Sequence, residues 1–293
     1  MNSIRRFLIL NSILVLPIAV SAQGLDTTKI DKALGRPGQK MGDVYKIGFP
    51  RTDLHVSVQG LAIKPGLALG SWAAFSGTDE NAMVMGDLVL LEDELNPVME
   101  KLRSAGFEIS AVHNHLINEK PHVMYMHCMG HGPAVELADS LQAALAVSKT
   151  PLGKPATGSA EPATPPDWVK TIEDTVGRKG NLKGGVLSFG VPRAEAISMS
   201  GMTITPAQGV AESINFQEAG SGKVATTGDF VLTATEVNSV ISALEQHHIL
   251  VTALHSHMLT EEPRLFFMHF WGYGPTQEVA AGIKAALDRV HTM

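Results

Sequence analysis

The sequence predicts an α+β fold that is internally duplicated: each half is a mostly antiparallel β-sheet with packed helices, and the halves pair about a pseudo-two-fold axis. One observation is a repeat, because a shift of 142 residues places MGDLVLLEDEL, starting at Met85, on TGDFVLTATEV, starting at Thr227. A second is that both copies contain the same succession of apolar, β-branched runs, Gly/Pro turn signals and amphipathic stretches, typical of sheets covered by helices. Two copies are too few for a solenoid.

The two copies cover residues 25–147 and 167–290. Between them, residues 148–166 are rich in Pro, Ala and Gly, which predicts an exposed linker between two repeat domains.

Each copy is expected to begin with a short helix that ends at a glycine, Gly35 in the first copy and Gly177 in the second. The next helix is expected to begin at an N-cap, Asp93 or Thr235, and to end before Gly106 in the first copy. The remaining elements predicted for the first copy are strands at 44–49, 54–63, 69–75, 83–91, 107–117 and 122–129, and a helix at 133–147.

The first 22 residues are predicted to be a secretory signal peptide and not part of the fold. A basic start at Arg5 and Arg6 precedes an apolar run, and small residues end at Ala22. The apolar run is shorter than the roughly 20 residues of a membrane span, although an uncleaved anchor is the alternative interpretation. We therefore expect a periplasmic or secreted protein, cleaved near Ala22, with no membrane span after cleavage.

Composition narrows the class of protein further. With 44% hydrophobic and 18% charged residues, the chain can bury a substantial core. The single cysteine, Cys128, excludes an internal disulfide framework. A net charge of −6 argues against a nucleic-acid partner, which would require a basic surface.

One histidine-rich stretch occurs twice. HNHLINEKPHVMYMHCMGHGP, starting at His113, and HSHMLTEEPRLFFMHFWGYGP, starting at His255, share His-x-His, Glu, Pro, Met-His and Gly-x-Gly-Pro at identical spacing. In a strand, residues two apart point to the same face, so the two histidines of each His-x-His project together. A hairpin centred near Lys120 would place His127 across from His113, at a Cβ distance of about 5 Å. The pattern therefore predicts three converging imidazoles in each half.

Converging imidazoles favour a divalent metal, with zinc as the first expectation and iron, manganese, nickel or copper as alternatives. The glutamates of the two hairpins, Glu119 and Glu261, are candidate ligands or catalytic general bases beside a metal-bound water. Whether the halves form two sites or share one stays open, as does the alternative that the histidines only pack in the core. The predicted metal ligands are His113, His115, His127, His255, His257 and His269.

Two other residue types recur between the copies. Asp87 and Asp229, in the repeated Gly-Asp, are interpreted as turn residues. Arg51 and Arg193 could pair with carboxylates of the fold or of a substrate, and the sequence does not decide between these.

The paired histidine units, with GR.G and G....F..PR upstream, resemble the bacterial family named after the lipoproteins LppY and LpqO, a domain-of-unknown-function family. The resemblance covers both halves and implies an exported protein, but brings little function with it. This chain lacks a lipobox cysteine, so lipid anchoring is not carried over.

Three functions are compatible with these observations. The first is an exported metal-dependent hydrolase or lyase acting on a small or cell-envelope molecule. The alternative is a non-catalytic periplasmic protein that binds metal or an envelope ligand. The third is a purely structural duplicated domain. The substrate and the oligomeric state are not encoded in any recognisable pattern.

Overall fold

The computed structural model describes residues 24–153 and 164–293. The predicted signal peptide and most of the predicted linker lie outside these residues. Among the described helices, none is long and apolar enough to cross a membrane.

Each half contains one six-stranded antiparallel sheet, and the two sheets have the same strand order. In the first half the order is β1 (Gln39–Met41), β2 (Val44–Pro50), β5 (Gly70–Gly77), β6 (Ala82–Leu91), β9 (Val123–Gly132) and β7 (Glu108–His113). In the second half it is β10 (Asn181–Lys183), β11 (Val186–Pro192), β14 (Ala211–Gly220), β15 (Lys223–Leu232), β17 (Phe266–Pro275) and β16 (Leu250–His255). The prediction of two repeated α+β halves is confirmed.

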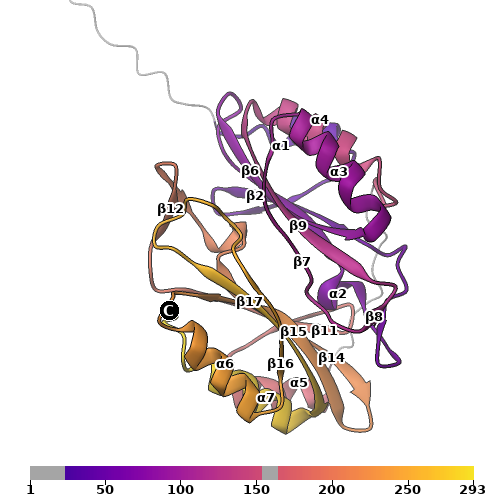
Figure 1. The fold of residues 1–293 in the computed structure, drawn as a ribbon, viewed down its shortest axis with the longest axis vertical. Coiled ribbons are helices and arrows are strands. Elements are labelled where there is room, and N and C mark those ends of the chain that lie inside the picture. The colour runs from indigo at the N-terminus through magenta and orange to yellow at the C-terminus, as the bar shows by residue number, and fades with distance from the viewer. Residues whose placement is uncertain (1–23, 154–163) are drawn as a thin grey trace, which may run out of the picture.

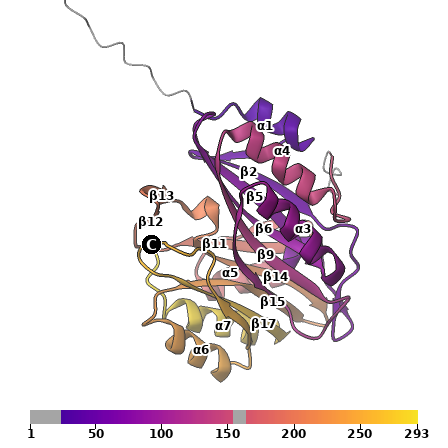
Figure 2. The ribbon, with the colours of Figure 1, turned by 45° about the horizontal axis from the view of Figure 1, so that its top comes forward.

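Helices cover the outer face of each sheet, and the inner faces of the two sheets meet (Figure 1; Figure 2). The helices of the first half are α1 (Thr27–Leu34), α3 (Glu92–Ser104) and α4 (Ala134–Leu145), and those of the second are α5 (Asp167–Val176), α6 (Val237–Gln246) and α7 (Thr276–Leu287). Short elements fill the connections: β3 (Ser57–Val58), β4 (Leu61–Ala62), α2 (Pro65–Ala68), β8 (Glu119–Lys120), β12 (Ile197–Met199), β13 (Met202–Ile204) and the 3₁₀ turn η1 (Pro206–Gln208).

The apolar core consists of separate clusters, which lie between a sheet and its helices or between the two sheets. One cluster in each half lies between the sheet and its own helices. Two further clusters contain residues of both halves: Trp271 joins first-half residues such as Val89, and Met129 joins second-half residues such as Val231. These mixed clusters hold the two sheets together on either side of the histidines.

The glycine helix ends are confirmed, whereas the predicted N-caps are wrong by one or two residues. Helices α1 and α5 end at Gly35 and Gly177, both with positive φ. Asp93 lies inside the first turn of α3, whose N-cap position is Leu91. The Glu94 carboxylate accepts the Leu91 N–H instead, at 2.8 Å. At α6 the N-cap position belongs to Glu236, next to the predicted Thr235.

The two capping glutamates also explain the repeated arginines. The buried Arg51 guanidinium donates to both oxygens of Glu94, at 2.7 and 3.2 Å, and to Asp53. Arg193 makes the equivalent contact with Glu236 at 3.1 Å. Both arginines therefore pair with carboxylates of the fold, which resolves the alternative left open by the sequence.

The predicted register of the histidine hairpin is wrong by two residues. His113 pairs with Tyr125, and Ala111 pairs with His127, with a bulge just before Ala111. The second half repeats this register, because His255 pairs with Phe267. The connection is not a tight hairpin: β8 leaves it to pair with β3, so β7 ends at His113 and does not continue to 117 as predicted.

Candidate metal centre

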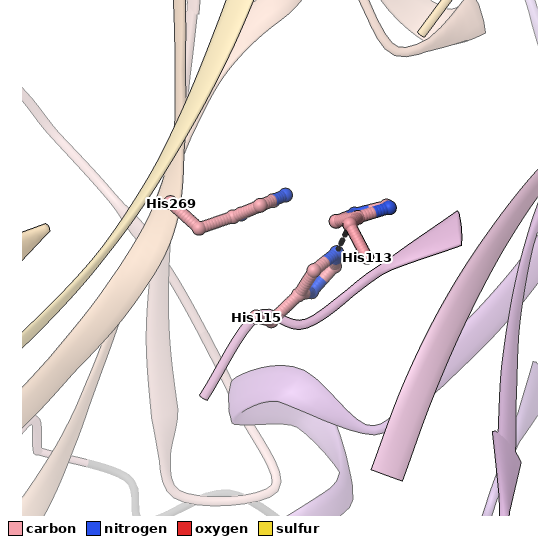
Figure 3. A group of neighbouring side chains, drawn as sticks. All are labelled: His113, His115 and His269. Carbon is pink, nitrogen blue, oxygen red and sulfur yellow. Dashed lines mark hydrogen bonds between the residues drawn. The ribbon is translucent and has the colours of Figure 1, made fainter. Parts of the chain in front are cut away.

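The six predicted histidines form one cluster between the two sheets. His113 is the last residue of β7, His115 follows it in the loop, and His127 lies within β9. His255, His257 and His269 occupy the equivalent places on β16, its following loop and β17. Figure 3 shows the imidazole of His269, from the second half, directed toward His113 and His115 of the first half.

Imidazole rings of one half lie against imidazole rings of the other. The ring centroids of His113 and His255 are 3.7 Å apart. Two further cross-half pairs are as close: His115 with His269, at 3.7 Å, and His127 with His257, at 3.8 Å. Because His257 is the repeat equivalent of His115 and His269 that of His127, these two pairs are related by the pseudo-two-fold axis. The histidines therefore form a single shared cluster and not two separate ones.

Three groups within the cluster bring three ring nitrogens within 4.8 Å of one another. Two of these groups combine both halves. The Nε2 atoms of His113 and His115 are 3.1 Å apart, close to the roughly 3.3 Å expected between two nitrogens on a tetrahedral zinc with Zn–N distances of about 2.05 Å. The groups are His113, His115 and His269; His113, His127 and His255; and His255, His257 and His269.

Burial keeps these imidazoles neutral. It lowers the pKa of His269 to about 4 and that of His257 to about 3. The pKa of His255 falls to about 2, through burial and then through the neighbouring His257. Burial, followed by the other histidines, also lowers the pKa of His113, His115 and His127. Neutral imidazole is the form that binds metals.

Backbone carbonyls orient two of the rings. His269 Nδ1 lies 2.8 Å from the carbonyl oxygen of Gly228, and His257 Nδ1 lies 3.3 Å from that of Gly209. A carbonyl only accepts hydrogen bonds, so Nδ1 carries the proton in each ring and Nε2 keeps its lone pair. The Nε2 atoms of His127, His257 and His269, and both ring nitrogens of His255, are buried without a hydrogen-bond partner.

Two carboxylates that the sequence interpretation set aside belong to this centre. Asp87 lies within β6, opposite His127, and Asp229 lies within β15, opposite His269. Their interpretation as turn residues is wrong, because Gly-Asp here occurs in the middle of a strand. The repeat was the signal that could have found them, since they recur at the same 142-residue shift as the histidines.

Burial raises the pKa of both aspartates. The pKa of Asp87 rises to about 8, first through burial and then through the negative charge of Asp229. The pKa of Asp229 rises to about 6, because the nearby His269 opposes part of the effect of burial. A cation that approaches such a buried carboxyl group stabilises its negatively charged form.

The two predicted glutamates are buried in the segments that follow the His-x-His motifs, Glu119 at the start of β8 and Glu261 in a loop. Glu119 accepts the N–H of Val123 at 3.3 Å and forms an ion pair with His122. Glu261 accepts the N–H of Leu265 at 3.0 Å and contacts Arg264. Among the described residues, the close contacts between the six histidines and carboxylate oxygens involve Asp87 and Asp229. The role of the glutamates as ligands or bases stays a prediction.

A cavity of about 450 Å³ adjoins the cluster. Its lining includes His115, His257 and His269 together with both aspartates. Equivalent elements of the two halves form its walls, among them α2 and η1, but the walls differ in chemistry. The first half supplies Lys46 and Trp72, and the second half supplies Glu212 and Asn215. The cavity is large enough for a small organic molecule beside the histidines.

Comparisons with solved structures return weak similarities. The trimeric bacterial microcompartment shell protein PduB is 12% identical, with 86% of this chain and 89% of that chain covered and a TM-score of 0.22. EtuB from Clostridium kluyveri is 10% identical, with coverage of 86% and 90% and a TM-score of 0.20. TP0453 is 10% identical, with coverage of 90% and 98% and a TM-score of 0.18. Scores this low support no conclusion about fold or function.

No curated protein matches the chain. A family model described as "Domain of Unknown Function (DUF1259)" matches twice, over residues 28–147 and 170–289. The two matches correspond to the two halves of the structure and together cover most of the sequence. The chain therefore belongs to this family of unknown function, present here as two tandem copies.

Proposed function

We propose that the shared histidine cluster binds a divalent metal ion, zinc in the first place, and that this centre is the functional site. The observation that carries the proposal is the convergence of six imidazoles from two copies of one motif, with ligand atoms within 4.8 Å in three groups. Packing alone would not require ring nitrogens buried without partners. A bound cation would satisfy several of them at once.

The chemistry we propose is metal-dependent hydrolysis or a lyase reaction on a small or cell-envelope molecule. A divalent ion can activate water or polarise an oxygen, and the adjoining cavity offers room for a substrate. Glu119 and Glu261 remain candidate bases. We also propose export to the periplasm or beyond, supported by the N-terminal sequence, and kinship with the LppY/LpqO proteins, supported by the paired histidine motifs.

The number of histidines favours a second candidate function. Catalytic zinc typically has three protein ligands and an open position, whereas six imidazoles could close the coordination shell. A closed centre would suit a metal-binding or envelope-ligand-binding protein without catalysis. Addition of azide to the cobalt-loaded protein separates the two candidates. A change in the visible absorption spectrum indicates an open position, and an unchanged spectrum indicates a closed shell.

Metal content tests the proposal directly. We expect purified wild-type protein, assayed by inductively coupled plasma mass spectrometry, to contain stoichiometric metal. The His113→Ala/His255→Ala variant should lose most of it, because these rings stack at the centre of the cluster. His55→Ala/His131→Ala, which removes two exposed histidines, is the matched control and should keep the metal. Equal metal content in all three proteins would contradict the proposal.

A further inference from the structure

Asp87 and Asp229 make equivalent contacts in the two halves. Asp87 Oδ2 lies 3.8 Å from His115 Nε2, and Asp229 Oδ2 lies 3.1 Å from His257 Nε2. Each aspartate also pairs across the sheet with the third histidine of its own half. In each half, the aspartate therefore faces the histidines from the strand beside the one that carries the third histidine.

The contact between Asp229 and His257 brings two acceptors together. Because His257 Nδ1 donates to the Gly209 carbonyl, its Nε2 atom has a lone pair and no proton. That lone pair lies 3.1 Å from a carboxylate oxygen, yet Nε2 has no hydrogen bond of acceptable geometry. Two acceptors at this distance repel unless they share a proton or a metal ion lies near both. Two ligand atoms of one metal ion typically lie about 3.0–3.4 Å apart, because the ligand–metal–ligand angle is bent.

The second oxygen of each aspartate supports the same conclusion. Both Oδ1 atoms are buried without a hydrogen-bond partner, although the residues are only 7% and 9% exposed. Ionising a buried carboxyl group that has an unpaired oxygen is costly unless a cation or a metal ion lies beside it. Burial raises the pKa of Asp87, and the charge of Lys46 in the cavity wall opposes part of that rise. Within the described part of the chain, however, the Lys46 ammonium group donates to the Ala207 carbonyl and lies over the Trp72 ring, and it forms no ion pair with either aspartate.

We propose that Asp87 and Asp229 are metal ligands, so that the centre is a mixed imidazole–carboxylate site. This inference rests on the proposed metal-binding function and assigns its oxygen ligands. A nitrogen and oxygen ligand set suits divalent zinc, iron or manganese, whereas monovalent copper prefers sulfur ligands. The preceding glycines fit this role, because the Gly228 carbonyl orients His269 while the next residue supplies the carboxylate.

The alternative is that each aspartate only positions a histidine that binds the metal. Affinity alone cannot separate these roles, since removing such a positioning group also costs about 10–100-fold. The visible absorption spectrum of bound Co²⁺ can separate the two roles, because its bands respond to the loss of an oxygen ligand. The test therefore measures both quantities on the same metal-depleted proteins.

We would titrate metal-depleted wild type, Asp87→Asn, Asp229→Asn and the double variant with Co²⁺ and with Zn²⁺ against a chelator. We expect each asparagine to weaken binding more than 10-fold, the double variant more than 100-fold, and the Co²⁺ bands to shift. Asp53→Asn and Glu195→Gln, equivalent carboxylates of the two halves that pair with Arg51 and Arg193 and not with the six histidines, are the matched controls and should retain wild-type affinity and spectrum.

Unchanged affinity in the double variant, or weaker binding with an unchanged Co²⁺ spectrum, would overturn the assignment while leaving the metal site intact. A wild type that binds no metal would instead overturn the proposed function itself. A crystal structure of the zinc-loaded wild type tests the proposal without depending on whether any variant folds. We expect an aspartate oxygen about 2.0–2.2 Å from the ion, and carboxylates farther than about 3 Å would refute the proposal.

Discussion

At the scale of single residues, the repeated Gly-Asp dipeptide shows how closely the strands around the centre are packed. A Cβ atom on Gly228 would lie 1.9 Å from the backbone oxygen of Ser213 on the neighbouring strand. On Gly86 it would lie 3.1 Å from the Cys128 sulfur. Position 228 therefore requires glycine, because the backbone of the adjacent strand leaves no room for a side chain. This close approach of the strands fixes the position of Asp229, the next residue, beside the histidines.

We expect Gly228→Ala to lower the free energy of unfolding by about 3 kcal/mol or more, because backbone must move to admit the methyl group. Gly190→Ala, in strand β11 of the same sheet with no atom within 4 Å of the added carbon, is the control. Urea unfolding of both variants measures the difference. Similar stability of the two proteins would show that the close approach at Gly228 is not real.

At the scale of elements, β17 contributes side chains to both faces of its sheet. Met268 and Phe270 pack with the helices of the second half, whereas Phe267, His269 and Trp271 lie on the opposite face, where the two halves meet. This alternation follows from the two-residue period of a strand. The same alternation accounts for Met126 and Cys128 of the equivalent strand β9, which pack in the core of the first half.

We expect Trp271→Ala to destabilise the protein by about 3–5 kcal/mol, because the indole fills a cluster made mostly of first-half residues. Tyr273→Ala, two residues farther along the same strand and 46% exposed, should change stability by less than about 1 kcal/mol. Thermal unfolding by calorimetry gives both values. Equal effects would mean that Trp271 does not join the two halves.

At the scale of the whole molecule, the most unusual feature is a set of uncharged histidines buried where two sheets meet. Such a centre makes stability depend on pH. The unfolded chain takes up protons near pH 6.5, whereas the folded protein does so only near the lowered pKa values, about 4 for His269 and 3 for His257. The unfolded state therefore binds more protons in this window, and stability falls as pH drops.

We expect the metal-depleted protein to lose about 2 kcal/mol or more between pH 7 and pH 5, since each buried histidine contributes up to about 1.4 kcal/mol per pH unit. The raised pKa values of Asp87, Asp229 and Glu212 act in the opposite direction and reduce the loss. Urea unfolding across this range measures it. His115→Gln/His257→Gln should flatten the dependence, whereas His55→Gln/His131→Gln should not. A flat profile in the wild type would contradict the expectation.

The sequence by itself determined the duplication, the α+β class of each half and the six histidines, because these depend on local periodicity and on a repeat at constant spacing. It did not determine the register of β7 with β9, since β8 leaves the expected hairpin to pair with a distant strand. Nor could it show that Asp87 and Asp229 reach the histidines. Only the tertiary structure decided that the halves share one cluster, because the packing of two sheets depends on contacts between residues far apart in the chain.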